Sequence, residues 1–231
     1  DQPWNAALFA AEADRLIQEI QSRKKMPFVV GGTGLHVKAL LYGLFSGPAA
    51  SKEIRDRLEK TPDLYGRLLQ VDPVTATRVH PNDPVRIIRA LEVFELTGKP
   101  ISAHQEEHGF SAPRYHHLKI GLRTNREELN QKIEGRVADM IRRGLEGEVK
   151  GLLDRWGEIP LLARAIGYKE WFEYFKNKKS REVVIEQIVI ATRQFAKRQE
   201  AWFRKEKDIC WFEADDREGI EKAVTLFLGS S

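Results

Sequence analysis

The sequence predicts an α/β protein with parallel strands and a separate helical domain inserted into it. Residues 27–46 contain a short apolar run, a glycine-rich turn and an amphipathic helix, which together make the repeating unit of a parallel sheet. Residues 47–113 carry helical patterns and turn signals but no strand pattern, and a strand pattern returns at 118–122. We therefore expect an α/β core domain over 1–46 and 114–231, with an all-helical insertion domain over 47–113.

The N-terminal elements follow from the spacing of apolar residues. A helical spacing runs through residues 6–23, and the run Phe28-Val29-Val30 after Pro27 predicts a short buried strand. The helix expected after the glycine turn has its apolar stripe at Val37, Leu40, Leu41 and Leu44.

The C-terminal half predicts mainly helices. Thr124 and Glu127 have the spacing of a capping box, so a helix should begin there and end at Gly144. Further helices are expected over residues 145–156, 165–177, 181–205 and 217–228, and a last strand over residues 209–212.

The composition permits an anionic partner and excludes an internal disulfide framework. The 231 residues include 38 Lys and Arg against 34 Asp and Glu, a net charge of +4 that suits an anion without requiring one. Cys210 is the only cysteine, as in proteins of a reducing cytosol. No apolar run approaches the roughly 20 residues of a membrane span. We expect a cytoplasmic protein, and its first residues, Asp1 to Trp4, read as the middle of a domain.

The glycine turn is a candidate phosphate site. Gly31, Gly32 and Gly34 allow close approach of a ligand to the backbone, and Thr33 adds a hydroxyl at the start of a helix. The structural alternative, a tight connection between strand and helix, stands equally. The chain contains no G-x-x-x-x-G-K-[ST] string, so the turn is not a Walker motif.

Two arginines stand near the start of a predicted helix, where a cation is unfavourable. Asp83 can cap a helix whose first residue is Pro84, which places Arg86 in the first turn and Arg89 one turn later. A cation in the first turn opposes the helix dipole by roughly 0.3–1 kcal/mol. Either these arginines face an anion such as RNA phosphate, or they pair with carboxylates of Asp83, Glu92 and Glu95.

Arg136 is predicted to share a helical face with Leu129, Ile133 and Met140. An arginine on an apolar stripe is costly unless it is paired or lines a cavity. It either extends over the core with its head in water, or it points into a polar channel that holds a diphosphate or a nucleotide.

The last long helix is basic. Arg193, Lys197 and Arg204 share one side, and Arg198 adjoins them. Such a side is either simply solvated or follows a phosphate backbone. The aromatic residues between 168 and 175 are interpreted as core rather than as a base-stacking platform. No histidine or cysteine has metal-ligand spacing.

Six short strings of residues follow one another along the chain. They are Val30-Gly31-Gly32-Thr33-Gly34-Leu35, His80-Pro81-Asn82-Asp83-Pro84, Arg86 with Arg89-Ala90-Leu91-Glu92-Val93, Lys132-Ile133-Glu134-x-Arg136, Ala165-Ile166-Gly167-Tyr168-Lys169-Glu170, and Ala191-Thr192-Arg193-Gln194-x-Ala196-Lys197-Arg198-Gln199. As an ordered set, these strings resemble the tRNA dimethylallyltransferases over nearly the whole chain.

The resemblance implies a P-loop-NTPase-like parallel α/β core with a helical insertion domain, and a tRNA anticodon stem-loop gripped between the two. It implies that the adenine 3′-adjacent to the anticodon is extruded into a channel. Dimethylallyl diphosphate enters the other end, with Mg²⁺ on its phosphates. The exocyclic amine attacks the allylic carbon and diphosphate leaves. A monomer is expected.

The resemblance also assigns roles to individual residues. Thr33 would touch the reacting adenine, and Arg136 would face the diphosphate, which makes these two the catalytic candidates. Arg164 would line the channel mouth. The remaining tRNA contacts would come from Arg55, Val85, Arg86, Arg89, Arg193, Lys197, Arg198 and Arg204.

The chain departs from the family pattern at two places. The Walker-like phosphate loop and the general-base aspartate of the family would stand upstream of residue 1, so we expect an incomplete sequence that is weakly active or inactive alone and contains no metal ligand. His36 stands where the family usually has Tyr.

Two other classes remain as alternatives. A small-molecule kinase on the same fold would have no use for Arg86, Arg89 and the basic helix. A non-catalytic RNA-binding module would bind tRNA without needing Thr33 and Arg136 to converge.

Overall fold

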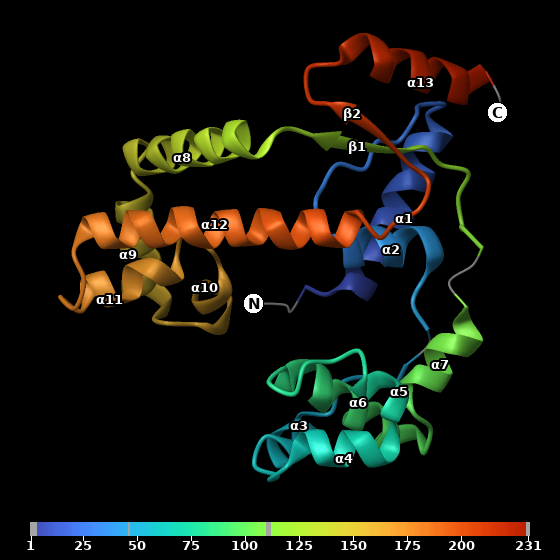
Figure 1. Cartoon of the computed structure of the whole chain (residues 1–231), viewed down its shortest axis with the longest axis vertical. Coiled ribbons are helices and arrows are strands. Elements are labelled where there is room, and N and C mark those ends of the chain that lie inside the picture. Colours follow the sequence, from blue (N-terminus) through green and yellow to red (C-terminus); the bar gives the residue numbers. More distant parts are fainter. Residues whose placement is uncertain (1–3, 46, 110–111, 230–231) are drawn as a thin grey trace. The chain divides into compact units, whose positions relative to one another are not determined.

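The computed structural model describes residues 4–45, 47–109 and 112–229. The chain divides into two compact units, Asp1–His116 and His117–Ser231 (Figure 1).

The first unit begins with a pair of packed helices, α1 (Ala6–Ser22) and α2 (Gly34–Tyr42). Small side chains allow them to approach closely, because Ala6, Ala10 and Ala39 are buried between them. The side chain of Asn5 caps α1 by accepting hydrogen bonds from two backbone amides at 3.0 Å each. Both helices were expected from the sequence and are confirmed.

The predicted strand at Phe28-Val29-Val30 is wrong for this structure. The three residues form neither helix nor strand, and their exposed fractions are 74%, 50% and 94%. A strand requires a neighbour whose backbone completes its hydrogen bonds. In the described part of the chain the only strand pair lies elsewhere, in the second unit.

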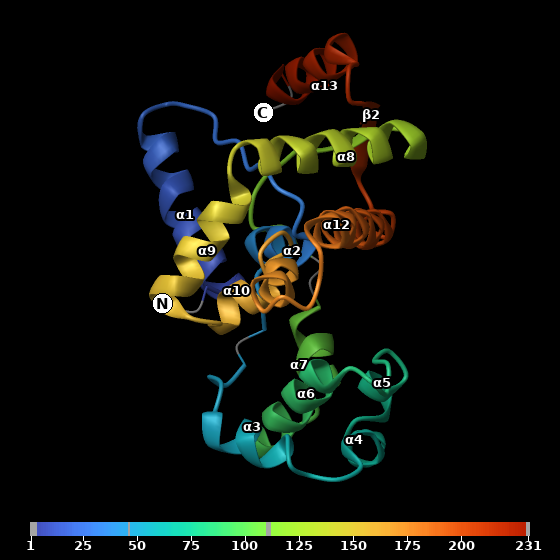
Figure 2. The ribbon, with the colours of Figure 1, turned by 90° about the vertical axis from the view of Figure 1, so that its left-hand side faces the viewer.

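The rest of the first unit is helical, as predicted. It comprises α3 (Lys52–Leu58), α4 (Leu64–Val71), α5 (Pro73–Ala76), α6 (Pro84–Thr97) and α7 (Ile101–His108). Figure 2 shows α3, α4 and α7 gathered around α6. The core of this bundle is built from α6, whose buried residues Ile87, Leu91 and Val93 pack against Leu58 and Leu68.

Aspartates begin three of these helices by accepting backbone amides. Asp83 accepts from the amide of Arg86 at 3.1 Å, so the predicted cap with Pro84 at the first position is confirmed. Asp72 is only 1% exposed and accepts from the amide of Thr75 at 2.9 Å and that of Ser102 at 3.0 Å. It therefore joins the start of α5 to the first turn of α7. The third aspartate is Asp63, which caps α4.

The second unit contains two parallel strands, β1 (Lys119–Arg123) and β2 (Ile209–Glu213), in a register that pairs Gly121 with Trp211. A Cβ atom at Gly121 would lie 2.6 Å from Cε3 of Trp211, so the indole ring occupies the space that a side chain would need. The helices of this unit are α8 (Arg126–Arg142), α9 (Leu145–Trp156), α10 (Pro160–Arg164), η1 (Lys169–Trp171), α11 (Phe172–Phe175), α12 (Arg181–Phe203) and α13 (Arg217–Gly229).

Trp171 is the centre of the core of the second unit. Its side chain is fully buried among Val137, Leu145, Val149 and Val184 of the surrounding helices. The rings of two neighbouring aromatic residues, Tyr174 and Phe175, lie within 6.0 Å of its own ring. The interpretation of this aromatic group as core is confirmed.

Two predicted boundaries are wrong. The capping box is replaced by Asn125, which accepts from the amide of Glu128 at 2.8 Å, while Thr124 donates its hydroxyl to the Glu128 carboxylate at 2.6 Å. The helix predicted over 165–177 is interrupted because Gly167 has a φ of +90°. Glu170 closes that turn by accepting the amide of Gly167 at 2.8 Å.

Among the described residues, no helix combines the length and apolar character needed to cross a lipid bilayer.

Replacing Trp171 by Ala should lower the free energy of unfolding of the second unit by about 3–5 kcal/mol, because the lost ring leaves a cavity that the helices cannot fill. Urea unfolding followed by circular dichroism measures this. The control Trp156→Ala removes an indole that is 52% exposed and should cost less than about 1 kcal/mol. Equal losses for the two variants would contradict the placement of Trp171 at the centre of the core.

The stability of the first unit should fall in acid through Asp72. Burial raises the pKa of this carboxyl, but the hydrogen bonds from Ser102 and Thr75 outweigh it, so the pKa is lower in the folded chain than its ordinary value. The stabilisation is therefore present above about pH 3.9 and is lost as the pH falls through the lowered pKa. Asp72→Asn should destabilise α5 and α7 near neutral pH, and its difference from wild type should shrink at lower pH. Amide hydrogen exchange of α5 to α7 over this range measures both effects, and a difference that does not change with pH would contradict the role of the charge.

Candidate nucleic-acid and transfer site

The glycine turn leaves open space at the start of α2. A Cβ atom at Gly31 would meet no atom within 4 Å, and this backbone does not have a positive φ. Nothing within the described chain therefore requires glycine at this position, which suits approach by a ligand. Thr33 is exposed at the N-cap position of α2, and its side chain makes no capping hydrogen bond. The hydroxyl is accessible at the positive end of a helix.

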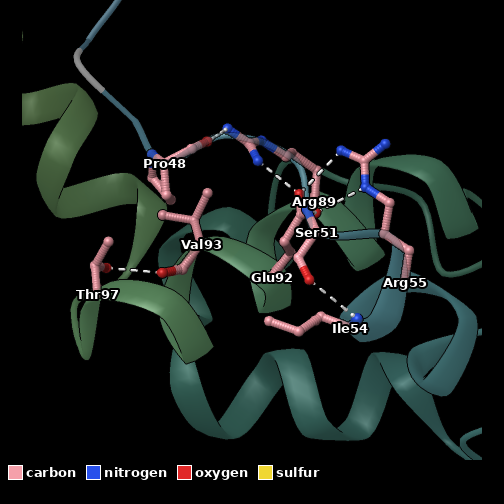
Figure 3. A network of polar contacts seen from close by, with 8 residues as sticks. All are labelled: Pro48, Ser51, Ile54, Arg55, Arg89, Glu92, Val93 and Thr97. Carbon is pink, nitrogen blue, oxygen red and sulfur yellow. Dashed lines mark hydrogen bonds and ion pairs between the residues drawn. The ribbon is translucent and has the colours of Figure 1, made fainter.

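A buried carboxylate organises two of the predicted arginines in the helical bundle (Figure 3). Glu92 of α6 is completely buried. Arg55 of α3 binds it with both ends of its fork, from Nε to Oε1 at 2.8 Å and from Nη2 to Oε2 at 2.9 Å. Arg89 donates from Nη1 to Oε2 at 2.6 Å, and the amide of Ser51 donates to Oε1 at 2.8 Å. Each carboxylate oxygen thus accepts two hydrogen bonds.

The charges of this network reinforce one another. Burial raises the pKa of the Glu92 carboxyl. The hydrogen bonds from Arg55, Arg89 and Ser51, together with the nearby Arg55 charge, lower this pKa by more than burial raises it. The pKa of Glu92 is therefore below its ordinary value. The hydrogen bond to Glu92 raises the pKa of Arg55. Glu92 and Arg55 are therefore both charged at neutral pH.

The first turn of α6 exposes two more residues predicted to contact tRNA, Val85 and Arg86. Val85 is 74% exposed although it is apolar. Arg86 is exposed and forms an ion pair with Asp83 at 2.9 Å. The structure therefore confirms carboxylate pairing for both Arg86 and Arg89. Glu95 takes neither of them, because it pairs with Arg57 and Arg67 instead.

Arg136 lies at the edge of the predicted apolar face. The buried side of α8 is centred on Ile133 and Val137, with Leu129 and Met140 partly buried, whereas Arg136 is exposed. Its exposure fits the alternative in which the head of the side chain reaches water. In the described part of the chain, Arg136 has neither an ion pair nor a hydrogen bond.

The basic side of α12 contains both paired and unpaired cations. Arg193 pairs with Glu134 of α8, and its Nε atom is buried without a hydrogen-bond partner among the described residues. Arg204 pairs with Glu200. Lys197 is exposed, and the guanidinium of Arg198 lies over the ring of Phe195, 5.8 Å from its centre. Arg164, the last residue of α10, is also exposed.

The structure groups some predicted site residues and leaves other groupings as predictions. It brings Arg55 and Arg89 together on Glu92, and it ties Arg193 to α8. The convergence of Thr33 and Arg136 on one channel remains a prediction. Sequence reasoning treated Glu92 only as a possible partner and missed it as the anchor of Arg55. The sequence did contain a signal for a buried ion pair. Glu92 follows Arg89 by about one helical turn, and the same part of α6 carries the apolar residues Ile88 and Leu91.

Metal ligands are not clustered in the described residues. No group of three or more His, Cys, Asp or Glu side chains there is arranged to hold a metal ion.

Comparison with known proteins gives one consistent result. The family model described as IPP transferase matches residues 1–206. The chain is 47% identical over 221 residues to a protein named tRNA dimethylallyltransferase 2 from Geotalea uraniireducens, which covers 92% of this chain and 71% of that relative. It is 46% identical over 220 residues to a tRNA dimethylallyltransferase from Geobacter sulfurreducens, again covering 92% of this chain and 71% of the relative.

Solved structures agree with the sequence relatives. The full-length tRNA isopentenylpyrophosphate transferase from Bacillus halodurans aligns with a TM-score of 0.66 and 33% identity, over 98% of this chain and 73% of that one. A eukaryotic dimethylallyltransferase, described as acting on tRNA, aligns with a TM-score of 0.78 and 30% identity, over 97% of this chain and 60% of that one. The predicted α/β class with parallel strands is confirmed by these likenesses and by β1 and β2. By its match to the family model and by its relatives, the chain belongs to the IPP transferase family.

Proposed function

We propose that this chain transfers a dimethylallyl group from dimethylallyl diphosphate to the exocyclic amine of the adenine 3′-adjacent to the tRNA anticodon. The observation that carries the proposal is family membership over residues 1–206, with relatives named as tRNA dimethylallyltransferases. The eukaryotic structure described as acting on tRNA supports tRNA as the acceptor. We also propose a cytoplasmic monomer.

The reaction exchanges one bond for another. A bond forms between the amine nitrogen and the first carbon of the allyl group, while the bond from that carbon to the diphosphate oxygen breaks. The leaving diphosphate takes the bonding electrons, and a base accepts a proton from the nitrogen. Catalysis therefore needs an oriented amine and cations beside the departing oxygens.

Thr33 and Arg136 are the proposed groups at the reacting centre. The exposed Thr33 hydroxyl has no capping hydrogen bond to give up, so it is available to orient the adenine. Arg136 has no carboxylate partner in the described chain, so its full charge is available to a diphosphate. Mg²⁺ would be bound through the donor's phosphates, a common mode for this ion.

The acceptor tRNA is proposed to contact cations of both units. In the helical bundle these are Arg55, Arg86 and Arg89, and the exposed Val85, which precedes Arg86 in the sequence, is proposed as an apolar contact. In the second unit they are Arg164, Arg193, Lys197, Arg198 and Arg204. A kinase would have no use for this set, and a pure RNA-binding module would have no use for Thr33 and Arg136.

The direct test is transfer of labelled dimethylallyl from its diphosphate to unmodified tRNA by the protein. We expect label on the adenine 3′-adjacent to the anticodon. Tight tRNA binding without transfer of label would overturn the transferase proposal and leave an RNA-binding module.

Arg136→Gln should lower kcat by roughly 100-fold or more with little change in tRNA affinity, because a preorganised charge at the leaving group acts in the transition state. Thr33→Ala should likewise reduce transfer more than tRNA binding. Arg142→Gln is the matched control, since Arg142 lies on the same helix but pairs with Asp139 at 2.6 Å. If Arg136→Gln weakens tRNA binding and leaves kcat unchanged, Arg136 belongs to the RNA-binding surface and not to the reacting centre.

The double variant Lys197→Ala/Arg198→Ala should weaken tRNA binding and reduce its salt dependence. Each lost phosphate contact lowers the slope of log K against log salt by roughly 0.7–0.9. Lys178→Ala/Lys179→Ala removes the same charge from the turn before α12 and serves as the control. An equal change in slope for both double variants would show that net charge, rather than the side of α12, binds the RNA.

A further inference from the structure

Glu92 pairs with two cations, although one is enough to neutralise its single negative charge. One bidentate arginine neutralises a carboxylate, and Glu92 already has that partner in Arg55 and a backbone donor in Ser51. Arg89 is a second cation on this carboxylate and donates to its Oε2 atom. These three side chains carry one negative and two positive charges, a surplus of +1 that attracts an anion. The Glu59 carboxylate, which forms no ion pair with Arg55 within 4.0 Å, also acts on Arg55 and offsets part of this charge.

The surplus charge is accessible from solvent. The Glu92 side chain is fully buried, but the Arg55 side chain is 42% exposed and that of Arg89 is 32% exposed. Arg55 uses Nε and Nη2 for Glu92, and its Nη1 makes no hydrogen bond within the described chain. Glu92 therefore binds the Nε and Nη2 edge of the Arg55 guanidinium and leaves Nη1 as a donor for another acceptor.

Arg89 is fixed from two directions. Its Nη1 binds Glu92 and its Nη2 donates to the carbonyl of Pro48 at 3.0 Å (Figure 3). Long side chains lose rotamer freedom when they bind a ligand, and prior fixation removes that loss from the binding step. Both guanidiniums are thus held in one orientation before any ligand arrives.

The neighbouring carboxylate on α6 contrasts with this arrangement. Glu95 also binds two arginines, Arg57 and Arg67, but these come from α3 and α4 and join those helices to α6. Neither is a predicted tRNA contact. Glu92 instead binds two residues proposed to contact tRNA, one of them on its own helix.

We propose that Glu92 is a positioning residue for RNA phosphate, which acts through Arg55 and Arg89 by holding their guanidinium groups toward the tRNA backbone. The inference rests on the proposed function, because it takes tRNA as the ligand. Glu92 itself touches no substrate.

The test is Glu92→Gln in the native protein, with an unmodified tRNA anticodon stem-loop as the binding probe. The amide keeps the shape of the side chain but carries no negative charge. It therefore cannot bind the two guanidinium groups as the carboxylate does. Affinity for the stem-loop should fall roughly tenfold. In the transfer assay KM for tRNA should rise by a similar factor, while kcat at saturating tRNA and KM for dimethylallyl diphosphate stay within about twofold.

Asp72→Asn is the matched control. It makes the same carboxylate-to-amide change at another buried site of the same bundle, where the partners are Thr75 and Ser102 and no arginine is involved. It should reduce stability and leave tRNA affinity unchanged. If it weakens tRNA binding as much as Glu92→Gln, general loosening of the bundle explains both and the positioning role is overturned.

A double-mutant cycle tests whether Glu92 acts through Arg55. In an Arg55→Ala background, Glu92→Gln should cost clearly less affinity than it does in the wild type. Full additivity of the two losses would contradict the proposal.

Further outcomes separate the inference from the proposed function. Failure of the wild-type protein to bind tRNA overturns both. Normal tRNA affinity of a folded Glu92→Gln variant, beside weakened binding by Arg55→Ala, overturns only the positioning role. If Glu92→Gln does not fold, Arg89→Lys decides, because it keeps the charge and loses the fixed fork. A several-fold loss supports orientation by Glu92, and unchanged affinity overturns it.

Discussion

The free-energy cost of burying a negative charge shapes the helical bundle more than any other constraint. An unpaired carboxylate inside a protein is strongly unfavourable, so its surroundings must supply donors. Glu92 obtains them from three places along the chain: Ser51 at the start of α3, Arg55 one turn later, and Arg89 on its own helix. The start of α3 is thereby held against α6.

Buried acids in other parts of the chain act in the same way. Asp72 and Glu170, the other buried charged residues among those described, also accept backbone amides where one element gives way to the next. Glu170 closes the turn at Gly167 within one of the strings that resembles the family. That string therefore contributes to folding whatever its role at a channel mouth.

The sequence was informative where local rules decide the structure. Asp83 with Pro84 gave the start of α6, and the apolar spacing gave α1, α2, α9 and α12 to within a few residues. It was misleading where neighbours decide. Phe28 to Val30 has the composition of a buried strand, yet in the described chain no strand pairs with it. The prediction of one continuous helix over 165–177 was wrong because Gly167 has a positive φ in a turn that Glu170 closes, which helical spacing does not report.

The candidate site divides along the same line. The pairing of Arg89 with Glu92 is a contact within one helical turn and was anticipated as an alternative. The bond from Arg55 spans 37 residues, and no local pattern indicates it. Arg136 was predicted on the face of Leu129, Ile133 and Met140. It lies at the exposed edge of that face because packing against the core centres the buried side on Ile133 and Val137.

The close contact between Gly121 and Trp211 has a consequence for register. Gly121 is the one residue of β1 without a side chain, and the indole occupies the space beside it. Moving β2 by one residue along β1 would take the indole away from that space and would turn every side chain of the strand to the other face. A single glycine thus favours one alignment of two strands that come from distant parts of the chain.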